Sequence, residues 1–505
     1  MIPLGPMEAA AALGLASLPC PVVGVSTDSR SVRPGDLFVA LRGERFDGHD
    51  YVSQALAAGA CAAVVEEGIW REKEPALSER ERSLVLVVRD SIGALGGLAH
   101  AVRRKSKAQV VAVTGSVGKT GTKDLIAAMA ATMGAVASTA GNQNNEIGVP
   151  LTLLTLKVDT TLAVVEMGMR GRGQIASLAH LVEPDVGVVT NVHPVHLEVV
   201  GSLQDVAEAK AELFFGLRAG GVAVLPFDSP LLEAHAVASS VPLVHFGFGP
   251  SAAGAEVRGT MTWDGAQAKL LLSWPEGQVE VATSFSSRHR LENAVAAAAA
   301  CYAAGLPLEE CAAGLTTAVF TESRGDTLEL RGITVVNDTY NASPAAVRAA
   351  IDDLTEFARS RNGRAVAVLG DMLELGPESS RYHWEVGAYA AEAGVTSLWG
   401  VGPLSRHTVE GFDSYDKAKA KVEYRESPPG LSRVQGRHIE ALSAGTGEIL
   451  DGLRSGDIVL MKASRVMRLE TLVEAAVERF GRMASGQAEP GDDALCESRR
   501  ARTAG

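Results

Sequence analysis

The sequence is short of positive charge and of long apolar runs. Its 47 Lys and Arg residues stand against 60 Asp and Glu, a formal net charge of −13, which excludes a bulk attraction to nucleic acid or anionic lipid. The longest apolar stretch, Ala294–Leu306, is too short to span a bilayer. The first basic residue is Arg30, so the apolar start lacks the charged region of a signal peptide. We therefore expect a cytoplasmic protein with no membrane span and no nucleic-acid partner.

Cysteine is also scarce. The five cysteines are scattered over 505 residues and form no C-x-x-C pair. Neither a disulfide framework nor a zinc site is indicated, and a reducing compartment fits best. Apolar residues, by contrast, make up 46% of the chain, which excludes disorder over its whole length.

Short β-branched runs alternate with alanine-rich helical patterns through most of the chain, which predicts an α/β fold with largely parallel sheets. Composition shifts predict domains over residues 1–106, 107–320 and 321–483, followed by a disordered polar tail over 484–505. Strands are expected at Val110–Thr114, Leu162–Glu166, Val186–Asn191, Val222–Leu225, Ile333–Asn337, Ala365–Leu369, Ser397–Val401 and Asp457–Met461. Helices are expected at Lys119–Met133, Ser202–Leu217, Arg290–Ala304, Pro344–Arg359 and Ser379–Ala393.

The most informative motif follows the strand Val110–Thr114, where the chain reads Gly-Ser-Val-Gly-Lys-Thr at the start of a helical pattern. The loop is shorter than the standard phosphate-binding spacing, but its physical logic is the same. Glycines let backbone N–H groups face a phosphate, the lysine reaches the terminal phosphates, and the threonine hydroxyl can ligate Mg²⁺. An ordinary glycine-rich turn has little use for Gly-Lys-Thr at a helix start. The sequence thus predicts nucleotide contacts from Gly115, Ser116, Gly118, Lys119 and Thr120.

Two further side chains follow the ends of predicted strands. Glu166 ends the strand Leu162–Glu166, and His196 follows the strand Val186–Asn191. The C-terminal ends of parallel strands converge on the ligand crevice of an open sheet, where a carboxylate and an imidazole could hold Mg²⁺ near phosphates. Taken singly, Glu166 could equally be a solvated loop residue and His196 a structural histidine.

Other motifs extend from about Ser26 to about Glu478. They are Thr27–Arg30, Pro34–Leu41, Gly43–Asp50, Gly141–Pro150, Glu166–Gly168, Asp338–Pro344 and Leu369–Gly376. In this order and spacing, and with the phosphate loop, they resemble the motifs of the Mur ligases of bacterial peptidoglycan synthesis. The Asn-Asn-Glu-Ile-Gly-Val-Pro, Tyr-Asn-Ala and Gly-Asp-Met-Leu-Glu-Leu-Gly runs are similar to those of the branch that adds a dipeptide.

The resemblance implies three domains: an N-terminal UDP-substrate domain, a central P-loop ATPase domain with a mostly parallel sheet, and a C-terminal Rossmann-like domain. It implies an ATP-dependent ligase that joins D-Ala-D-Ala to the C-terminal carboxylate of UDP-MurNAc-tripeptide through an acyl phosphate. ATP and two Mg²⁺ ions are the implied cofactors, and the two substrates are the implied partners. A monomer is our default expectation.

The resemblance also implies roles for the residues around the phosphates. Thr120 and Glu166 would hold one Mg²⁺ and His196 the other, while Lys119 and the metals neutralise the reacting anions. Arg324 matches the arginine that meets the γ-phosphate from the third domain. His193 matches no family position and is expected to be structural.

Lys210 lies where the family carries a carbamylated lysine, a modification that turns the amine into a carboxylate-like Mg²⁺ ligand. The alternative is a plain lysine on a solvated helix face beside Glu208 and Glu212. With Lys210, the implied catalytic set is Lys119, Glu166, His196, Lys210 and Arg324, and the implied metal set is Thr120, Glu166, His196 and Lys210.

The remaining implied contacts concern the nucleoside and the UDP-linked substrate. Asn293 matches an adenine-side asparagine, and Asp338 matches a carboxylate near the ATP ribose. The substrate-binding residues implied by family position are Ser29, Arg30, Asp47, Asn142, Asn145 and Asn341.

The sequence departs from the family pattern in three places. Arg290 replaces an asparagine on the adenine side, where its guanidinium could stack on the base. Gly121 stands where Thr or Ser is common, which we expect to matter little. Ala463 and Val466 replace glycines, and they would be strained if their backbones needed a positive φ.

Three alternatives stay open at this point. A sister Mur ligase or a folylpolyglutamate synthetase would share the phosphate loop but lack the Gly-Asp-Met-Leu-Glu-Leu-Gly run. A P-loop nucleotide switch would not need the other motifs, and the Asn-Lys-x-Asp guanine motif of GTPases is absent. An inactive scaffold would not need every charged group that the chemistry uses.

Overall fold

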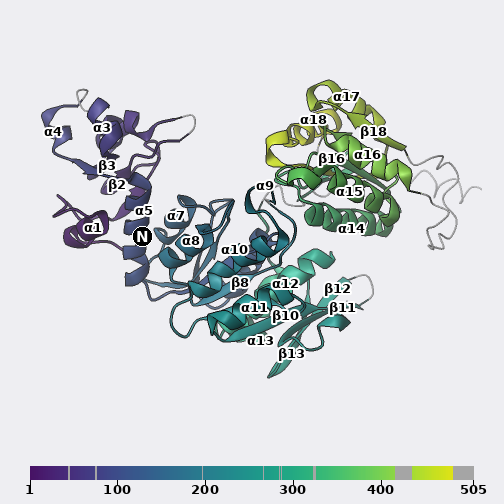
Figure 1. Cartoon of the computed structure of the whole chain (residues 1–505), viewed down its shortest axis with the longest axis horizontal. Helices are drawn as coiled ribbons and strands as arrows, with labels where there is room; N and C mark the ends of the chain where they lie inside the picture. Colours follow the sequence, from purple (N-terminus) through teal and green to yellow (C-terminus); the bar gives the residue numbers. More distant parts are fainter. Residues whose placement is uncertain are drawn as a thin grey trace, which may run out of the picture. The chain divides into compact units, whose positions relative to one another are not determined.

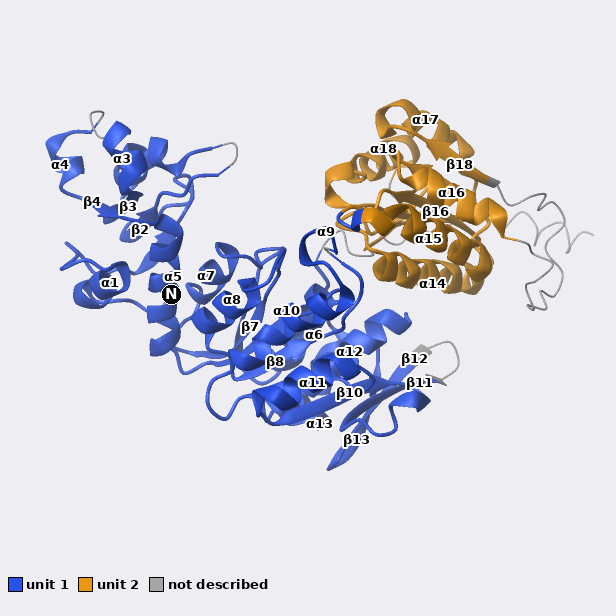
Figure 2. Cartoon of the chain, in the orientation of Figure 1, with its two compact units in different colours: residues 1–322, 374–376 blue, residues 323–373, 377–505 orange. Residues whose placement is uncertain are grey.

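The chain forms two compact units, which we describe separately (Figure 2). Unit 1 comprises residues 1–322 with 374–376, and unit 2 comprises residues 323–373 with 377–505. The computed structural model describes residues 1–43, 46–73, 77–195, 197–264, 267–283, 285, 287–321, 326–415 and 435–481. The predicted tail lies outside the described residues, and the predicted domain boundaries at 106 and 320 stay predictions.

Unit 1 begins with a small α/β module (Figure 1). Its four strands pair in parallel in the order β1-β2-β3-β4. The strands are β1 Gly24–Ser26, β2 Asp36–Val39, β3 Ala62–Glu66 and β4 Val85–Val88. The helices are α1 Pro6–Leu13, α2 Val52–Ala57, α3 Glu67–Lys73, α4 Glu79–Arg82 and α5 Ser91–Lys105.

The rest of unit 1 is built on a nine-stranded sheet in the order β13-β12-β11-β10-β9-β8-β5-β7-β6. All neighbours are parallel except β11–β12 and β12–β13. The strands are β5 Gln109–Thr114, β6 Ala135–Ser138, β7 Thr160–Glu166, β8 Val186–Val189, β9 Val222–Pro226, β10 Leu243–Phe248, β11 Val257–Asp264, β12 Gln267–Trp274 and β13 Gly277–Ala282. The helices are α6 Lys119–Ala130, α7 Gly148–Leu153, α8 Gln174–Val182, α9 Leu197–Val200, α10 Leu203–Phe215, α11 Pro230–Ser239, α12 Arg288–Ala303 and α13 Leu308–Cys311.

Strand β5 is apolar on both faces because helices cover both sides of the sheet. Successive side chains of a strand point to opposite faces. Val110 and Ala112 accordingly belong to the apolar cluster that contains α7, α8 and α10, whereas Val111 and Val113 belong to the cluster that contains α6 and α12. The loop after β5 is therefore held on a rigid, fully buried strand.

Helix α12 is unusual for its run of small side chains. Every residue from Ala294 to Cys301 is at most 1% exposed. A Cβ built on Gly259 of β11 would lie 2.2 Å from Val295 Cγ2, so the helix lies very close to the sheet at this point. Small residues on both sides permit that close approach.

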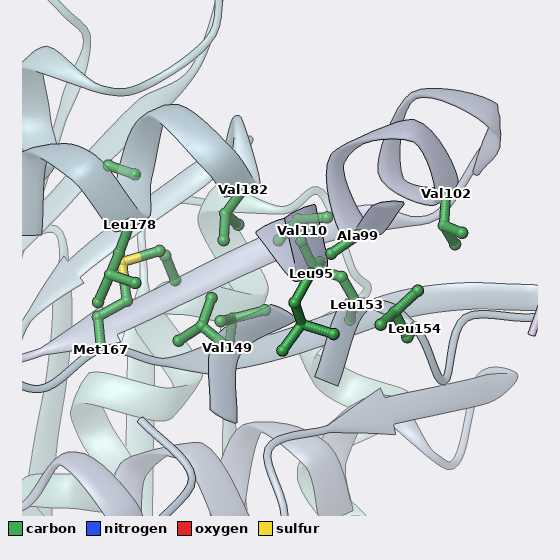
Figure 3. Packing of buried hydrophobic residues seen from close by; sticks show 14 of the residues in the cluster. Leu95, Ala99, Val102, Val110, Val149, Leu153, Leu154, Met167, Leu178 and Val182 are labelled. Atoms are coloured by element: carbon green, nitrogen blue, oxygen red, sulfur yellow. The ribbon is translucent and has the colours of Figure 1, made fainter. Parts of the chain in front are cut away.

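Helix α5 joins the N-terminal module to the large sheet. Leu95, Ala99 and Val102 of α5 are buried in one cluster with Leu153 of α7 and Val182 of α8 (Figure 3). The same cluster contains strand residues of both sheets. The two parts of unit 1 thus share one apolar core.

Unit 2 contains a six-stranded sheet in the order β14-β15-β19-β16-β17-β18, antiparallel only between β14 and β15. Its strands are β14 Asp326–Leu330, β15 Ile333–Asn337, β16 Arg364–Gly370, β17 Ser397–Val401, β18 Gln435–Ile439 and β19 Asp457–Lys462. Its helices are α14 Pro344–Ser360, α15 Ser379–Ala393, α16 Ser405–Ser414, α17 Leu442–Gly452 and α18 Glu470–Phe480.

The predicted α/β class with parallel sheets is confirmed. Ile333–Asn337, Ser397–Val401 and Ser379–Ala393 have the predicted bounds, and the other predicted elements differ by a few residues at their ends. The antiparallel edge β11–β13 was not predicted. Within the part of the chain that the structure describes, no helix combines the length and apolar character needed to cross a bilayer.

A buried ion pair fastens α5 to the large sheet. The Arg103 guanidinium, 4% exposed, donates to the Val182 carbonyl at 2.8 Å and to Asp185 Oδ2 at 3.3 Å. Asp185 Oδ2 also accepts the Val110 N–H at 2.8 Å, and Arg218 lies 2.5 Å from Asp185 Oδ1. The Asp185 carboxylate thus neutralises the buried Arg103 charge and also accepts a hydrogen bond from the backbone of β5.

We predict that Asp185→Ala lowers the free energy of unfolding by about 3 kcal/mol, because it leaves the Arg103 charge buried without its carboxylate. Urea unfolding followed by circular dichroism measures the change. The exposed Asp159 offers a control, since Asp159→Ala removes the same charge and should change stability by less than about 0.5 kcal/mol. Equal effects of the two substitutions would contradict the assignment.

Candidate active site

The phosphate loop has the backbone that its sequence predicts. Gly118 occupies the N-cap of α6 with φ +83°, and Gly115 has φ +148°. A Cβ on Gly115 would lie 1.9 Å from Thr190 Oγ1, and one on Gly118 would lie 2.3 Å from Asn293 Oδ1. Both positions therefore require glycine, and the loop ends at a helix N-terminus, where anions are favoured.

The segment after β8 holds the loop in place. Asn191 Oδ1 accepts the Val117 N–H at 2.9 Å, and its Nδ2 donates to the Val117 carbonyl at 3.0 Å. The Ser116 hydroxyl donates to the His193 carbonyl at 3.0 Å and accepts the His193 N–H at 2.9 Å. Because this segment supplies both donors and acceptors, the loop is shaped without a bound ligand.

Thr120 and Glu166 meet at the adjoining ends of α6 and β7. The Thr120 hydroxyl donates to Glu166 Oε2 at 2.7 Å, and both residues are fully buried. Asn144 Nδ2 donates to Glu166 Oε1 at 2.8 Å, and Thr139 Oγ1 accepts the Glu166 N–H at 3.0 Å. The carboxylate is thereby oriented on both of its oxygens.

Three basic groups gather beside this pair. The Lys119 amine donates to the Gly115 carbonyl at 2.8 Å and to the Ser116 carbonyl at 3.2 Å. Burial lowers the pKa of the Lys210 amine well below its ordinary value, and the nearby Lys119 charge lowers it further. Burial also lowers the pKa of His193, an effect that Glu292 opposes and Lys210 reinforces. The expected structural role of His193 stays a prediction.

The structure overturns the alternative of a solvated lysine. Lys210 is 2% exposed, whereas Glu208 and Glu212 on the same helix bind groups of the β7–α8 loop. Burial disfavours the charged form of the amine and so favours the neutral form, whose nitrogen lone pair can react with CO₂. The burial of Lys210 fits the carbamylation that the family pattern implies.

The adenine-side residues lie at the N-terminal end of α12. Asn293 is 6% exposed, and its side chain lies against Gly118 and Gly121 of the α6 N-terminus. A Cβ on Gly121 would lie only 3.0 Å from Asn293 Nδ2. The absence of a side chain at Gly121 therefore leaves room for the Asn293 amide to lie close to α6. The Arg290 guanidinium lies 4.5 Å from the centroid of the Phe320 ring, so a protein ring already occupies one face of the group that could stack on the base.

Two predicted residues of the site, His196 and Arg324, lie outside the described residues. Nothing in the structure therefore bears on their predicted contacts with metal and γ-phosphate.

Asp338 and Asn341 lie in unit 2, just beyond β15. The Lys462 amine, at the end of the neighbouring strand β19, donates to Asp338 Oδ2 at 2.5 Å and to the Asn341 carbonyl at 2.9 Å. Neither Ala463 nor Val466 has a positive φ. The backbone strain that we considered at these two departures from the family pattern does not occur.

The predicted UDP-substrate residues have varied surroundings. Arg30 is exposed and pairs with Asp28, whereas Ser29 is buried and its hydroxyl donates to Gln54 Oε1 at 3.3 Å. Asp47 Oδ1 lies 2.6 Å from His49 Nδ1.

The other two predicted UDP-substrate residues lie between β6 and α7. Asn145 Oδ1 accepts the N–H groups of Ile147 and Gly148 at the start of α7. The Asn142 carbonyl accepts the Asn144 N–H at 2.8 Å. The side chain of Asn145 thus shapes the backbone of its own motif.

The arrangement suits phosphate and Mg²⁺ chemistry. Magnesium prefers oxygen ligands and is commonly held by one or two carboxylates together with substrate phosphates. Among the described residues no three His, Cys, Asp or Glu side chains converge as a metal site. A metal here would instead depend on Thr120, Glu166, the nucleotide phosphates and a modified Lys210, a donor set that fits the ion.

Sequence reasoning missed the residues that support the site. Asn144 orients Glu166, Asn191 holds the phosphate loop, and the buried Lys123 donates to the Thr139 carbonyl at 2.9 Å. Asn144 lies inside the motif Gly141–Pro150, between Asn142 and Asn145, two predicted substrate-binding residues. What distinguishes Asn144 from these two asparagines is its contact with Glu166 at the end of β7. The sequence alone does not show that contact.

Three family models match the chain in sequence. They are the Mur ligase family catalytic domain over residues 21–103, the Mur ligase middle domain over 113–301 and the Mur ligase glutamate ligase domain over 323–465. The three matches agree with the predicted three-domain order.

The chain is also similar to individual proteins with one name, UDP-N-acetylmuramoyl-tripeptide–D-alanyl-D-alanine ligase. The Bacillus subtilis relative is 34% identical over 90% of this chain and 93% of its own length. The Escherichia coli relative is 39% identical over 75% of this chain and 81% of its own.

Solved structures give the same result. The crystal structure of MurF from Acinetobacter baumannii matches with a TM-score of 0.79 and 28% identity, covering 94% of this chain and 99% of that one. MurF from Thermotoga maritima in complex with ADP matches with a TM-score of 0.73 and 26% identity, covering 90% of this chain and 97% of that one. By sequence and by structure, the chain belongs to the Mur ligase family.

Proposed function

We propose that this protein is an ATP-dependent ligase that joins D-Ala-D-Ala to the C-terminal carboxylate of UDP-MurNAc-tripeptide. The choice of substrates rests on the 34% identity to a ligase of that name over 90% of this chain. The chemistry is supported by the buried Thr120–Glu166 pair at the start of α6, beside the Lys119 and Lys210 amines.

The reaction is proposed to run in two steps. The substrate carboxylate oxygen attacks the γ-phosphorus of ATP, forming an acyl phosphate as the bond to ADP breaks. The dipeptide amine then attacks the carbonyl carbon, the amide C–N bond forms, and phosphate leaves while the amine loses a proton. Both reacting partners of the first step are anions, so positive charge must be present at the site.

This chain's residues would supply that charge and the positioning. The loop N–H groups at the α6 N-terminus would bind the phosphates, and the Lys119 amine would exchange its loop carbonyl partners for phosphate oxygens. Thr120 and Glu166 would hold Mg²⁺, which when bound neutralises phosphate charge. His196 and Arg324 complete the proposal on the family pattern alone.

Lys210 is proposed to be carbamylated. Its uncharged amine nitrogen would form a C–N bond to CO₂ and release one proton, leaving a carbamate anion. The burial of Lys210 and the nearby Lys119 charge support this step, since a cation beside the carbamate stabilises the anion.

Phosphate release from ATP tests the proposed function, measured with UDP-MurNAc-tripeptide present and with D-Ala-D-Ala added or omitted. We expect release to require both substrates and a product mass equal to their condensation. A requirement for a different amino acid or for a folate would assign the chain to a sister ligase. Hydrolysis indifferent to both substrates would favour a nucleotide switch.

We predict that Lys119→Ala lowers ATP turnover at least about a hundredfold, since the loop then lacks its one side-chain cation. The fold should persist, because Lys119 lies at the first turn of α6 and is only partly buried. Steady-state phosphate release and circular dichroism measure the two effects. Turnover at the wild-type rate would refute the assignment of the loop.

We predict that Lys210→Met abolishes ligation but raises the free energy of unfolding in bicarbonate-free buffer at pH 7. The unfolded chain protonates Lys210 below its ordinary pKa of 10.5, whereas the buried amine resists protonation. The unfolded state therefore binds more protons, and the stability of the unmodified wild type rises as the pH rises toward 10.5. Methionine removes that dependence.

Urea unfolding at pH 7 and pH 9 checks this prediction. The stability gain of the variant should be larger at pH 7 than at pH 9. A variant that is less stable than the wild type at both pH values would contradict the buried, uncharged amine.

A further inference from the structure

Helix α10 presents two chemically different faces. Asp205, Glu208 and Glu212 are spaced three and four residues apart, so they lie on one side of the helix. Lys210 lies on another side and is buried beside the phosphate loop. Because both faces belong to one helix, an interaction that fixes the position of the acidic face also fixes the position of the Lys210 side chain.

The acidic face is bound by Arg172 of the β7–α8 loop. Arg172 Nη1 and Nη2 donate to the two carboxylate oxygens of Glu208 at 3.1 and 2.8 Å. Arg172 Nη2 also donates to Asp205. A two-pronged guanidinium–carboxylate pair of this kind restricts orientation as well as distance.

A second contact fixes the same loop one turn further along α10. Glu212 accepts the Gly173 N–H at 2.6 Å and the Ala176 N–H at 3.0 Å. N–H groups at the start of a helix such as α8 have no acceptor within the helix itself. Arg172 and Gly173 are adjacent, so the end of the loop is held to α10 at two levels.

The other end of this loop is the candidate metal site. The loop leaves β7 directly after Glu166 and enters α8 after Gly173. Glu166 is fixed by Thr120 and Asn144, and the far end is fixed to α10 by Arg172. The seven loop residues 167–173 thus connect one candidate Mg²⁺ group, Glu166, to the helix that carries the other, Lys210.

We propose that Arg172 is a positioning residue that sets the Lys210 side chain relative to Glu166 by clamping the acidic face of α10. The proposal rests on the proposed role of Lys210 as a carbamylated Mg²⁺ ligand. Arg172 is about half exposed, and exposed ion pairs contribute little to stability. The clamp therefore acts on the geometry of the site more than on the folding free energy.

The test compares Arg172→Met with a matched control, Arg170→Met. Arg170 lies two residues earlier on the same loop and is exposed, so its substitution removes the same charge outside the clamp. Two readouts are taken from full-length protein: the Mg²⁺ concentration for half-maximal ligation, and the carbamate signal in ¹³C NMR of nucleotide-free protein equilibrated with ¹³C-bicarbonate.

For Arg172→Met we expect about a tenfold higher Mg²⁺ requirement, the usual effect of losing a group that orients a metal ligand, and a weaker carbamate signal. Excess bicarbonate should restore part of the activity. Arg172→Lys, which keeps the charge but not the fork, should lie in between. Glu208→Gln, at the other end of the clamp, should shift both readouts in the same direction as Arg172→Met.

The outcomes separate this inference from the function on which it rests. If Arg172→Met matches Arg170→Met in Mg²⁺ requirement and carbamate signal, the clamp has no positioning role, whatever the thermal midpoint. If wild-type protein shows no carbamate signal and Lys210→Met keeps its Mg²⁺ dependence, the proposed role of Lys210 fails instead. A lower thermal midpoint with unchanged Mg²⁺ requirement would reduce Arg172 to a purely structural role.

Discussion

The hydrogen bond between Thr120 and Glu166 is the contact around which the site is organised. It joins the first turn of α6 to the end of β7, two elements that the chain order separates by β6 and α7. Both side chains are fully buried, and a buried carboxylate persists only where hydrogen bonds satisfy it. The surrounding groups, Asn144 on the other oxygen and Thr139 on the backbone, meet that requirement.

The charge distribution shows how an acidic protein can be suited to bind anions. The net charge of −13 opposes any general attraction of nucleotides to the surface. At the phosphate loop, however, Lys119, Lys210 and His193 lie together. Burial disfavours the charged forms of Lys210 and His193, so the positive charge that would meet phosphate at this point is that of Lys119.

The sequence predicted the parts of the fold that local patterns determine. The buried strand β5 and the glycines of its loop are consecutive residues, and the predicted order of strand, loop and helix is observed there. The antiparallel edge β11–β13 was missed although β11 alternates between apolar or small and polar residues along Val257–Asp264. Its pairing with β12 and β13 joins segments whose partners the local pattern does not name.

Roles that depend on distant contacts could not be read in the same way. Lys210 has acidic neighbours in sequence, which suggests a solvated face, yet the turn of the helix sends its amine to the interior. The adjoining Glu208 faces Arg172, 36 residues away. The spacing of residues shows which side chains share a face of α10. Only the fold shows that the acidic face meets the β7–α8 loop and that Lys210 points to the interior.

The small side chains of α12 have a consequence for how this protein can change over evolutionary time. Because the helix lies almost in contact with β11 at Gly259, its distance from the sheet is set by the absence of side-chain volume. A larger residue on the face of α12 that packs against β11 would lift the helix, and Asn293 at its start would withdraw from Gly118. Substitutions at this point of the helix would thus act on the candidate site from a distance, through side-chain volume alone.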